Sequence, residues 1–368
     1  MAFNPPPYPH DRLHGLRARA EAVRGGLVDA SVGTPVDPMP QVAIDALAHA
    51  APESTGYPPA VGTPELRDAA SAWMQRRLGV AVAAAHVVAC VGTKELVASL
   101  PRVLALRDPS REVVLYPEVS YPTYAMGAAL AGLRAIPVPL GERRHPDLSR
   151  VRDDDADRAL VLWLNEPSNP TGAAASADEL ATMVDWARER GIVVASDECY
   201  IEFTEGHPPA SALGAGSDGV LAVHSLSKRS NMAGLRAGFV AGDPELVTYL
   251  AEIRRHAGMM VPRPVQAAAA AALDDDDHVA AQRERYAKRR AALLPALEGI
   301  GLVHHGGDST FYLWLRDTGG GDGWHIAQRL ADAGLLVAPG DFYGDDHHAR
   351  LSLTITDDRT TLAAERLR

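Results

Sequence analysis

Short apolar runs alternate with segments of helical periodicity over most of this 368-residue chain. Amphipathic stretches, such as the one at 41–50, separate runs that have the length of buried strands. The runs cover residues 87–91, 113–116, 159–164, 192–195 and 220–223. This repeated strand and helix pattern predicts a large α/β domain with a mostly parallel sheet, whose ligands bind at the ends of the strands.

The last third of the chain predicts a second unit. A charged segment at 282–297 is typical of a long helix that links two domains, and strand and helix patterns follow at 311–315 and 326–333. The chain is also too long for one small core, so we expect a smaller α/β domain beside the large one. Residues 4–9, NPPPYP, are too rich in proline for regular structure and predict an extended N-terminal arm.

Composition and charge narrow the possible functions. The chain has 46% hydrophobic and 23% charged residues and a net charge of −11, which disfavours a nucleic-acid partner because that role needs a basic surface. No apolar run reaches the ~18 residues of a membrane helix and no leader pattern is visible, so we expect a cytoplasmic protein without a membrane partner. Cys90 and Cys199 lie far apart without a CxxC spacing, which predicts two buried thiols and neither a disulfide nor a metal site.

One lysine follows a strand among polar residues. The run at 220–223 leads into Ser225, Ser227 and Lys228, and Arg236 comes eight residues after the lysine. If the segment is extended, the two hydroxyls face one way and the lysine the other. Hydroxyls and a guanidinium suit a phosphate, and a nearby fixed cation favours the nucleophilic free amine of a lysine. The segment predicts a lysine that reacts with a phosphorylated carbonyl compound.

Polar motifs follow three other strands. NEPSNPTG occupies 165–172, SDECY occupies 196–200, and GTKE at 92–95 combines a glycine turn with a helix N-terminus, which suits a phosphate. The candidate phosphate residues of this turn are Gly92, Thr93 and Lys94. Taken singly, an Asn-Pro is commonly a turn and an Asp at a strand end commonly caps a helix. The occurrence of all of them at strand ends favours one shared site.

Together these motifs resemble those of the class I/II, fold-type-I aminotransferases that use pyridoxal 5'-phosphate (PLP). The shared patterns are Ser-x-Ser-Lys with a later Gly-x-Arg, Asn-Pro-Thr-Gly and Asp-Glu-x-Tyr. The resemblance implies that Lys228 binds the cofactor covalently and that Asp197 pairs with its pyridinium nitrogen. It further implies that Asn169 and Tyr200 share the ring oxygen and that Tyr121 stacks on the ring.

The same resemblance assigns the remaining site residues. It implies that Ser225, Ser227 and Arg236 bind the cofactor phosphate with the turn at 92–94. Tyr57 would reach the phosphate of a neighbouring subunit, which implies a homodimer with shared sites. Gly33 would lie beside the substrate carboxylate, and Arg350, expected to open a strand at 351–355, would grip that carboxylate through two parallel hydrogen bonds.

The resemblance also implies domains and substrates. Residues 34–284 would form the large PLP-binding domain, and 1–33 with 285–368 the small domain and arm. VGTKELV, SLSKRSNMAGLRAGF and PGDFYG look most like actinobacterial succinyldiaminopimelate aminotransferases of lysine synthesis, which implies N-succinyl-LL-2,6-diaminopimelate and 2-oxoglutarate/glutamate as substrates. Both carry a distal carboxylate, so a second cation is expected; the candidates are Arg229, Arg263 and Lys94.

Several alternatives stay open. The cofactor residues would serve equally in an aminotransferase for another amino acid or in a PLP-dependent C–S β-lyase, and a ligand-sensing regulator of the same fold would carry an added basic domain. GAGSDG at 214–219 satisfies GxGxxG, but a strand follows it where a helix should begin, so we interpret it as a loop. His347 and His348 beside two aspartates predict an exposed loop, and 274–277 predicts a solvated one.

Overall fold

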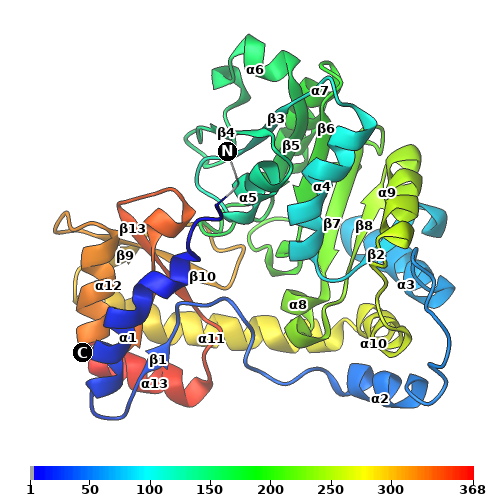
Figure 1. Ribbon diagram of the computed structural model, residues 1–368. Coiled ribbons are helices and arrows are strands. Elements are labelled where there is room, and N and C mark those ends of the chain that lie inside the picture. Colours follow the sequence, from blue (N-terminus) through cyan, green and yellow to red (C-terminus); the bar gives the residue numbers. More distant parts are fainter. Residues whose placement is uncertain (1–3) are drawn as a thin grey trace.

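The computed structural model describes residues 4–368, so residues 1–3 of the predicted arm lie outside the described part. A seven-stranded sheet forms the centre of the larger part of the molecule (Figure 1). In spatial order its strands are β2 (Val87–Cys90), β8 (Gly238–Gly242), β7 (Val220–Ser225), β6 (Val193–Asp197), β5 (Ala159–Asn165), β3 (Val113–Pro117) and β4 (Arg134–Val138). All neighbouring pairs are parallel except the two that involve β8. The predicted mostly parallel sheet is confirmed.

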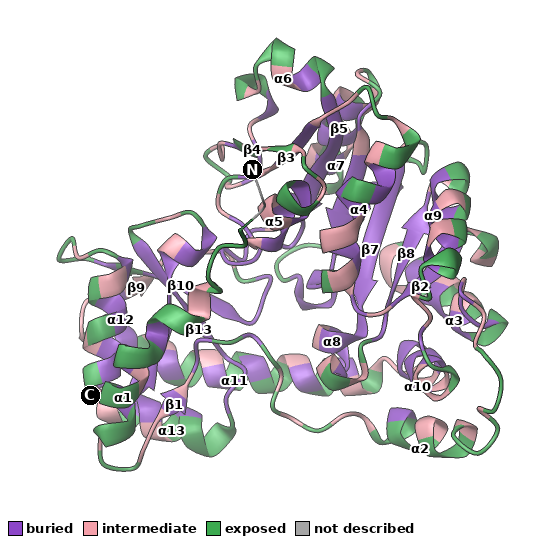
Figure 2. Ribbon diagram, in the orientation of Figure 1, coloured by how far each residue is buried: buried purple, intermediate pink, exposed green. Residues whose placement is uncertain are grey.

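Helices cover both faces of the sheet because successive side chains of a strand point to opposite faces. In β2, Val87 and Ala89 belong to one buried cluster, and Val88 and Cys90 belong to the other. The sheet strands are largely buried (Figure 2). One face is covered by α4 (Thr93–Arg107), α5 (Thr123–Leu130) and α9 (Pro244–His256), and the other by α2 (Gln41–Ala50), α3 (Pro64–Trp73), α7 (Ala177–Arg188) and α10 (Arg263–Asp274).

A second core lies beside this domain. Its antiparallel sheet has the order β12 (Ala338–Pro339), β13 (His348–Ser352), β10 (Tyr312–Asp317) and β9 (Leu302–His304), while β1 (Val28–Asp29) pairs in parallel with β11 (Leu335–Leu336). Helices α1 (His14–Ala22), α12 (Gly323–Asp332) and α13 (Asp357–Arg366) contribute to the same core. The long helix α11 (Asp277–Gly299) extends from the side of α10 to the second core (Figure 1). The predicted domain boundary at 284/285 falls inside this helix and stays a prediction.

Caps and loops complete these elements. Thr63 caps α3, since its Oγ1 accepts a hydrogen bond from the Leu66 amide at 3.3 Å. After the two-residue β1 the chain turns, and Val32, Gly33 and Thr34 line a cavity. The segment at 214–219 leads directly into β7 and forms a loop, as predicted.

The histidine loop differs from its prediction. His348 is buried and begins β13, where its ring stacks on Trp314 and its Nε2 lies 2.9 Å from His305 Nδ1. Within residues 4–368, no group of three or more His, Cys, Asp or Glu side chains is placed to hold a metal ion. None of the helices in this described range is long and apolar enough to cross a bilayer. Both cysteines are free and buried, which confirms the two buried thiols that were expected.

Candidate active site

A cavity of about 640 Å³ lies where the carboxyl ends of the central strands face the second core. Twelve of the fourteen residues predicted for the site line it. They are Gly33, Thr93, Lys94, Tyr121, Asn169, Asp197, Tyr200, Ser225, Ser227, Lys228, Arg236 and Arg350. Topology explains the convergence, because β5, β6 and β7 are parallel neighbours and their final residues share one edge of the sheet.

One end of the cavity has the chemistry of a phosphate site. Thr93 begins α4, whose first amide groups have no partners within the helix. Gly92 precedes it with φ 71°, and a side chain there would collide with the guanidinium of Arg236. The helix terminus and the guanidinium therefore approach each other closely only because position 92 lacks a side chain. Gly92 thus supports the cavity wall without lining it.

Asp197 lies at the end of β6 in the buried base of the cavity. Its carboxylate accepts hydrogen bonds from the Tyr124 hydroxyl at 2.9 Å and the Cys199 amide at 3.2 Å. Burial raises the pKa of Asp197, although hydrogen bonds from Cys199 and Tyr124 oppose that rise. Both donors are neutral, so the negative charge is available to a cation inside the cavity.

Lys228 lies on α8 (Leu226–Arg229), a single helical turn. The expected extended segment is therefore wrong: Ser225 caps this turn by accepting a hydrogen bond from the Ser227 amide at 3.1 Å. The ammonium of Lys228 donates to the carbonyl of Gly33. The pKa of Lys228 is lowered to about 8, mainly because the amine is buried and in smaller part because of the charges of Arg350 and Arg236.

Arg350 lies in the middle of β13, not at the start of a strand as predicted, and it is 4% exposed. Its guanidinium donates to Asn169 Oδ1 and to the Ser31 carbonyl, each at 2.9 Å. The rings of Tyr312 and Tyr343 lie 4.1 and 4.6 Å from its central carbon. This held guanidinium is a suitable partner for a carboxylate in the cavity.

Tyr200 contacts the second core. Its hydroxyl lies 2.9 Å from that of Tyr312, and a side chain at Gly33 would collide with the same Tyr312 hydroxyl. Asn169 is the residue expected to share a ligand oxygen with Tyr200. Its backbone N–H donates a hydrogen bond to Asn165 Oδ1 at 2.8 Å, which fixes the position of the residue. The shared contact itself stays a prediction.

Three predicted residues lie away from the cavity. Tyr57 is 94% exposed, so it does not contribute to the cavity of its own chain. Arg263 is exposed at the start of α10, and Arg229 is buried against Glu202 beneath α8. The last two are therefore wrong as candidates for a second substrate-binding cation, which leaves Lys94.

Sequence reasoning missed several lining residues. Tyr8 of the arm and His10, in the short helical turn Pro9–Leu13 that follows it, line the cavity with Tyr124, Tyr312 and Tyr343. Lys94 Nζ lies 5.1 Å from the ring centre of Tyr8 and 5.9 Å from that of Tyr121. Tyr343 could have been found, because it belongs to the PGDFYG motif. The contacts of the arm had no local signal, since they depend on where the chain folds back.

The residues present fit PLP. A helix terminus, two serines and Arg236 match its phosphate, the buried Asp197 matches a pyridinium nitrogen, and the Lys228 amine matches its aldehyde. When bound, PLP supplies a ring that accepts the electrons left when a substrate Cα–H bond breaks. The cavity thus has the features of a PLP-dependent active site, and it lies between the seven-stranded sheet and the second core.

Comparison with known proteins identifies the family. Residues 26–367 match the model of aminotransferase class I and II, and the chain belongs to this PLP-dependent family. It is 48% identical to the 4-dedimethylamino-4-oxo-anhydrotetracycline transaminase OxyQ of Streptomyces rimosus, over 98% of this chain and 99% of that protein. It is 35% identical to the LL-diaminopimelate aminotransferase of Aquifex aeolicus, over 99% and 96%.

A solved structure agrees. That of a probable N-succinyldiaminopimelate aminotransferase from Thermus thermophilus matches with a TM-score of 0.86 and 30% identity, covering 97% of this chain and 98% of the other. The predicted fold type, cofactor and aminotransferase class are confirmed.

Proposed function

We propose that this aminotransferase transfers the amino group between N-succinyl-LL-2,6-diaminopimelate and 2-oxoglutarate/glutamate, a step of lysine and diaminopimelate synthesis. Each of these substrates has one carboxylate beside the reacting carbon and another farther away. The observation that carries the proposal is the pair of cations, Arg350 and Lys94, that line one cavity. The names of the Aquifex and Thermus relatives also point to diaminopimelate-like substrates.

Both cations lie close to the N-terminal segment that lines the cavity. Burial lowers the pKa of His10, and the charges of Arg350 and then Lys94 lower it further, so both cations act on this one arm residue. The pKa of Lys94 is raised, because the effects of Tyr121 and Tyr8 outweigh that of burial. Lys94 therefore stays charged at neutral pH and can bind a distal carboxylate, while Arg350 binds the α-carboxylate.

The remaining roles follow from position. Arg350 holds the α-carboxylate, and the Lys228 amine takes the proton from the substrate Cα. Asn169 and Tyr200 would orient the cofactor ring through its ring oxygen. Asp197 would balance the positive charge of the pyridinium nitrogen at the base of the cavity. Tyr57, exposed on its own chain, would complete the phosphate site of a second subunit in a homodimer.

A half-reaction tests the substrate. Purified PLP-loaded protein is mixed with N-succinyl-LL-diaminopimelate, and the cofactor absorbance is followed; LL-diaminopimelate, glutamate and cystathionine serve as the comparison panel. We expect fast conversion with the succinylated substrate and reversal by 2-oxoglutarate. Conversion by another panel member alone would contradict the proposal. Pyruvate and a thiol from cystathionine would instead identify a C–S β-lyase.

A second candidate deserves one assay because of the 48% identity to OxyQ. That relative's name describes a tetracycline-type ketone as the amino acceptor. The aminated enzyme, prepared with glutamate, is therefore also mixed with 4-dedimethylamino-4-oxo-anhydrotetracycline. The second candidate would be favoured if this ketone returned the aminated cofactor to its aldehyde form faster than 2-oxoglutarate does, and faster than the oxo acid formed from N-succinyl-LL-diaminopimelate.

A further inference from the structure

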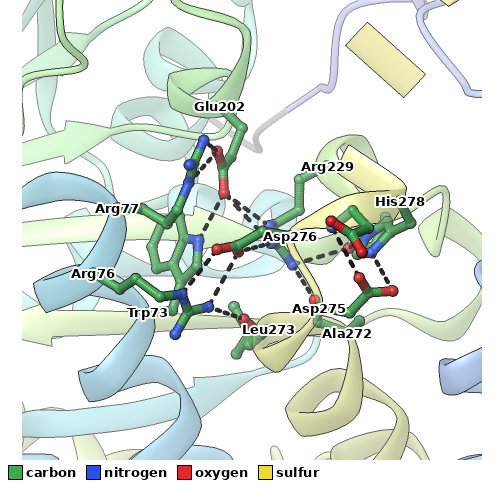
Figure 3. Close-up of polar contacts among 12 residues, drawn as sticks. Trp73, Arg76, Arg77, Glu202, Arg229, Ala272, Leu273, Asp275, Asp276 and His278 are labelled. Atoms are coloured by element: carbon green, nitrogen blue, oxygen red, sulfur yellow. Dashed lines mark hydrogen bonds and ion pairs between the residues drawn. The ribbon is translucent and has the colours of Figure 1, made fainter. Parts of the chain in front are cut away.

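Several charged side chains form a connected group around the buried pair of Glu202 and Arg229, and Arg229 belongs to the turn that carries Lys228 (Figure 3). The group lies outside the cavity described above and is not used by the proposed reaction. We call it the Glu202 cluster. It comprises Trp73, Arg76, Arg77, Glu202, Arg229 and Asp276.

Glu202 is 4% exposed, and its carboxylate accepts hydrogen bonds from side chains of three separate elements. Trp73 Nε1 donates to Oε1 at 2.7 Å, and Arg77 donates to Oε2 at 3.1 Å. Arg229 donates to Oε1 through Nε and Nη2, each at 3.4 Å. The carboxylate follows Tyr200 by two residues, so the cluster is attached to the segment that also carries Asp197.

Arg229 directly follows Lys228 in the sequence. Like Glu202, its side chain is held by several contacts. Besides Glu202, its guanidinium donates to the Ala272 carbonyl at 2.6 Å, at the end of α10, and lies 3.9 Å from Asp276. Arg76 holds the same junction through Asp276 at 2.8 Å and the Leu273 carbonyl at 2.7 Å. The side chain of Arg229 thus joins the lysine turn to the segment after β6 and to the start of α11.

The lysine turn needs such an anchor. A helix of four residues has one turn of hydrogen bonds, and isolated helices shorter than ~12 residues are marginal in water. The Ser225 cap holds its beginning, but Arg229 is its final residue. Arg229 projects into the cluster while Lys228 projects into the cavity, so contacts of the first side chain determine where the second one lies.

We propose that Arg229, held by Glu202, is a positioning residue that keeps the Lys228 amine at the base of the active-site cavity. The inference rests on the role of Lys228 in the proposed function, but not on the identity of the substrate. Arg229 acts through position, because the cations with the strongest direct effect on Lys228 are Arg350 and Arg236. Without the anchor, the turn opens and the amine becomes hydrated.

The test measures the lysine itself. The full-length chain, stripped of cofactor, is mixed with PLP between pH 6 and 11; the product is trapped with borohydride and the labelled lysine is identified by mass spectrometry. In the wild type, attachment to Lys228 should rise with a midpoint at about 8, because the free amine forms as the pH passes its pKa. In Arg229→Met the midpoint should move up towards the usual lysine value of about 10.4.

The holoenzyme supplies a second readout. Arg229→Met should lower kcat by about 100-fold, the size expected for a misplaced reacting group, with KM for the amino acid within about twofold. Arg229→Lys and Glu202→Gln should show smaller shifts in the same direction. If Arg229→Met does not fold, these two variants carry the test. The double variant that combines Arg229→Met with Glu202→Gln should lower kcat no more than the worse of its two single variants, because the two residues act as a pair.

The control is Arg111→Gln, which removes another inward-facing arginine. Arg111 donates to the carbonyls of Ala159 and Arg190 at the opposite end of the sheet strands. It should reduce stability without moving the pH midpoint. A midpoint near 8 and unchanged kcat in folded Arg229→Met would overturn the proposal and leave the cluster a stabilising one. Label on Lys94 or Lys288 would instead refute the assignment of Lys228.

Discussion

The two walls of the active-site cavity are built in different ways. The cofactor wall consists of strand ends and turns of one sheet, including Asp197, Lys228 and Thr93 at the start of α4. The substrate wall consists of the N-terminal arm, the loop after β1, the side chain of Lys94 beside the arm and the middle of β13, which are far apart in sequence. Arg350 joins them, since it belongs to the second core but donates to Asn169 of the first.

This difference separates reaction from substrate. The cofactor wall contains the groups that would bind PLP and transfer the proton, and its geometry is set by strand pairing within a single core. The substrate wall contains the cations that would select the amino acid, and its geometry depends on how two cores meet. Changes in the cofactor wall should therefore affect every substrate, whereas changes in the substrate wall should affect some more than others.

Lys228→Ala should have the largest effect. A positioned proton-transfer group contributes roughly 10²–10⁴-fold, so kcat should fall by at least about 10³-fold with every substrate because covalent attachment is also lost. PLP should still bind, more weakly, through its phosphate and Asp197. The measurement is turnover and cofactor retention after gel filtration. Lys288→Ala, at an exposed lysine, is the matched control. Turnover near wild type would refute the role of Lys228.

Arg350→Lys should come next. A lysine cannot make two parallel bonds to a carboxylate, and loss of the fork should lower kcat/KM for amino acids by about 100-fold. The reaction of a simple primary amine, which has no α-carboxylate, should change little. Comparing the two rates separates substrate binding from general damage. Arg316→Lys, at an exposed residue of β10, is the control. An equal loss for the amine would contradict the assigned role.

Lys94→Met should act on one class of substrate. It removes an ammonium that lies between Tyr8 and Tyr121 and keeps a side chain of similar length. We expect kcat/KM for N-succinyl-LL-diaminopimelate and glutamate to fall by about tenfold, the size of one charge-assisted hydrogen bond. Alanine, which has no distal carboxylate, should be affected less. An equal loss for all three would place Lys94 in the cofactor wall.

Tyr124→Phe should have the smallest effect. It removes the neutral donor to Asp197 and leaves the Cys199 amide in place. A hydrogen bond to a charged group contributes about 1.5–3 kcal/mol, but PLP itself would supply a stronger partner, so kcat should fall by only about two- to fivefold. Its absorbance titration with PLP should show weaker binding. A loss as large as that of Lys228→Ala would show that the Asp197 environment was misjudged.

Much of the cofactor wall could be predicted from sequence because its residues sit at fixed positions beside strands. Asp197 ends β6, Thr93 begins α4 and Lys228 follows β7, so a motif and its strand together specify the location. The prediction erred where the backbone departs from the simplest form. An extended segment was expected at 225–228, but the Ser225 cap makes a helical turn there.

The substrate wall and the Glu202 cluster resisted prediction. Nothing near Arg229 in the sequence distinguishes an arginine that faces the cavity from one that faces away, because a single helical turn decides the direction of its side chain. Tyr124 and His10 likewise have ordinary sequence surroundings, and their roles depend on the residues that folding brings beside them.

By itself, the sequence determined the α/β class, the PLP chemistry and most of the residues that line the cofactor wall, since these follow from local periodicity and from motifs at strand ends. Only the tertiary structure decided which cations face the substrate, how Arg350 is held, and that Arg229 anchors the lysine turn from below. The physical reason is range in the sequence. A motif specifies a few consecutive residues, whereas burial and hydrogen bonding bring together segments as distant as Ser31 and Arg350, which are 319 residues apart.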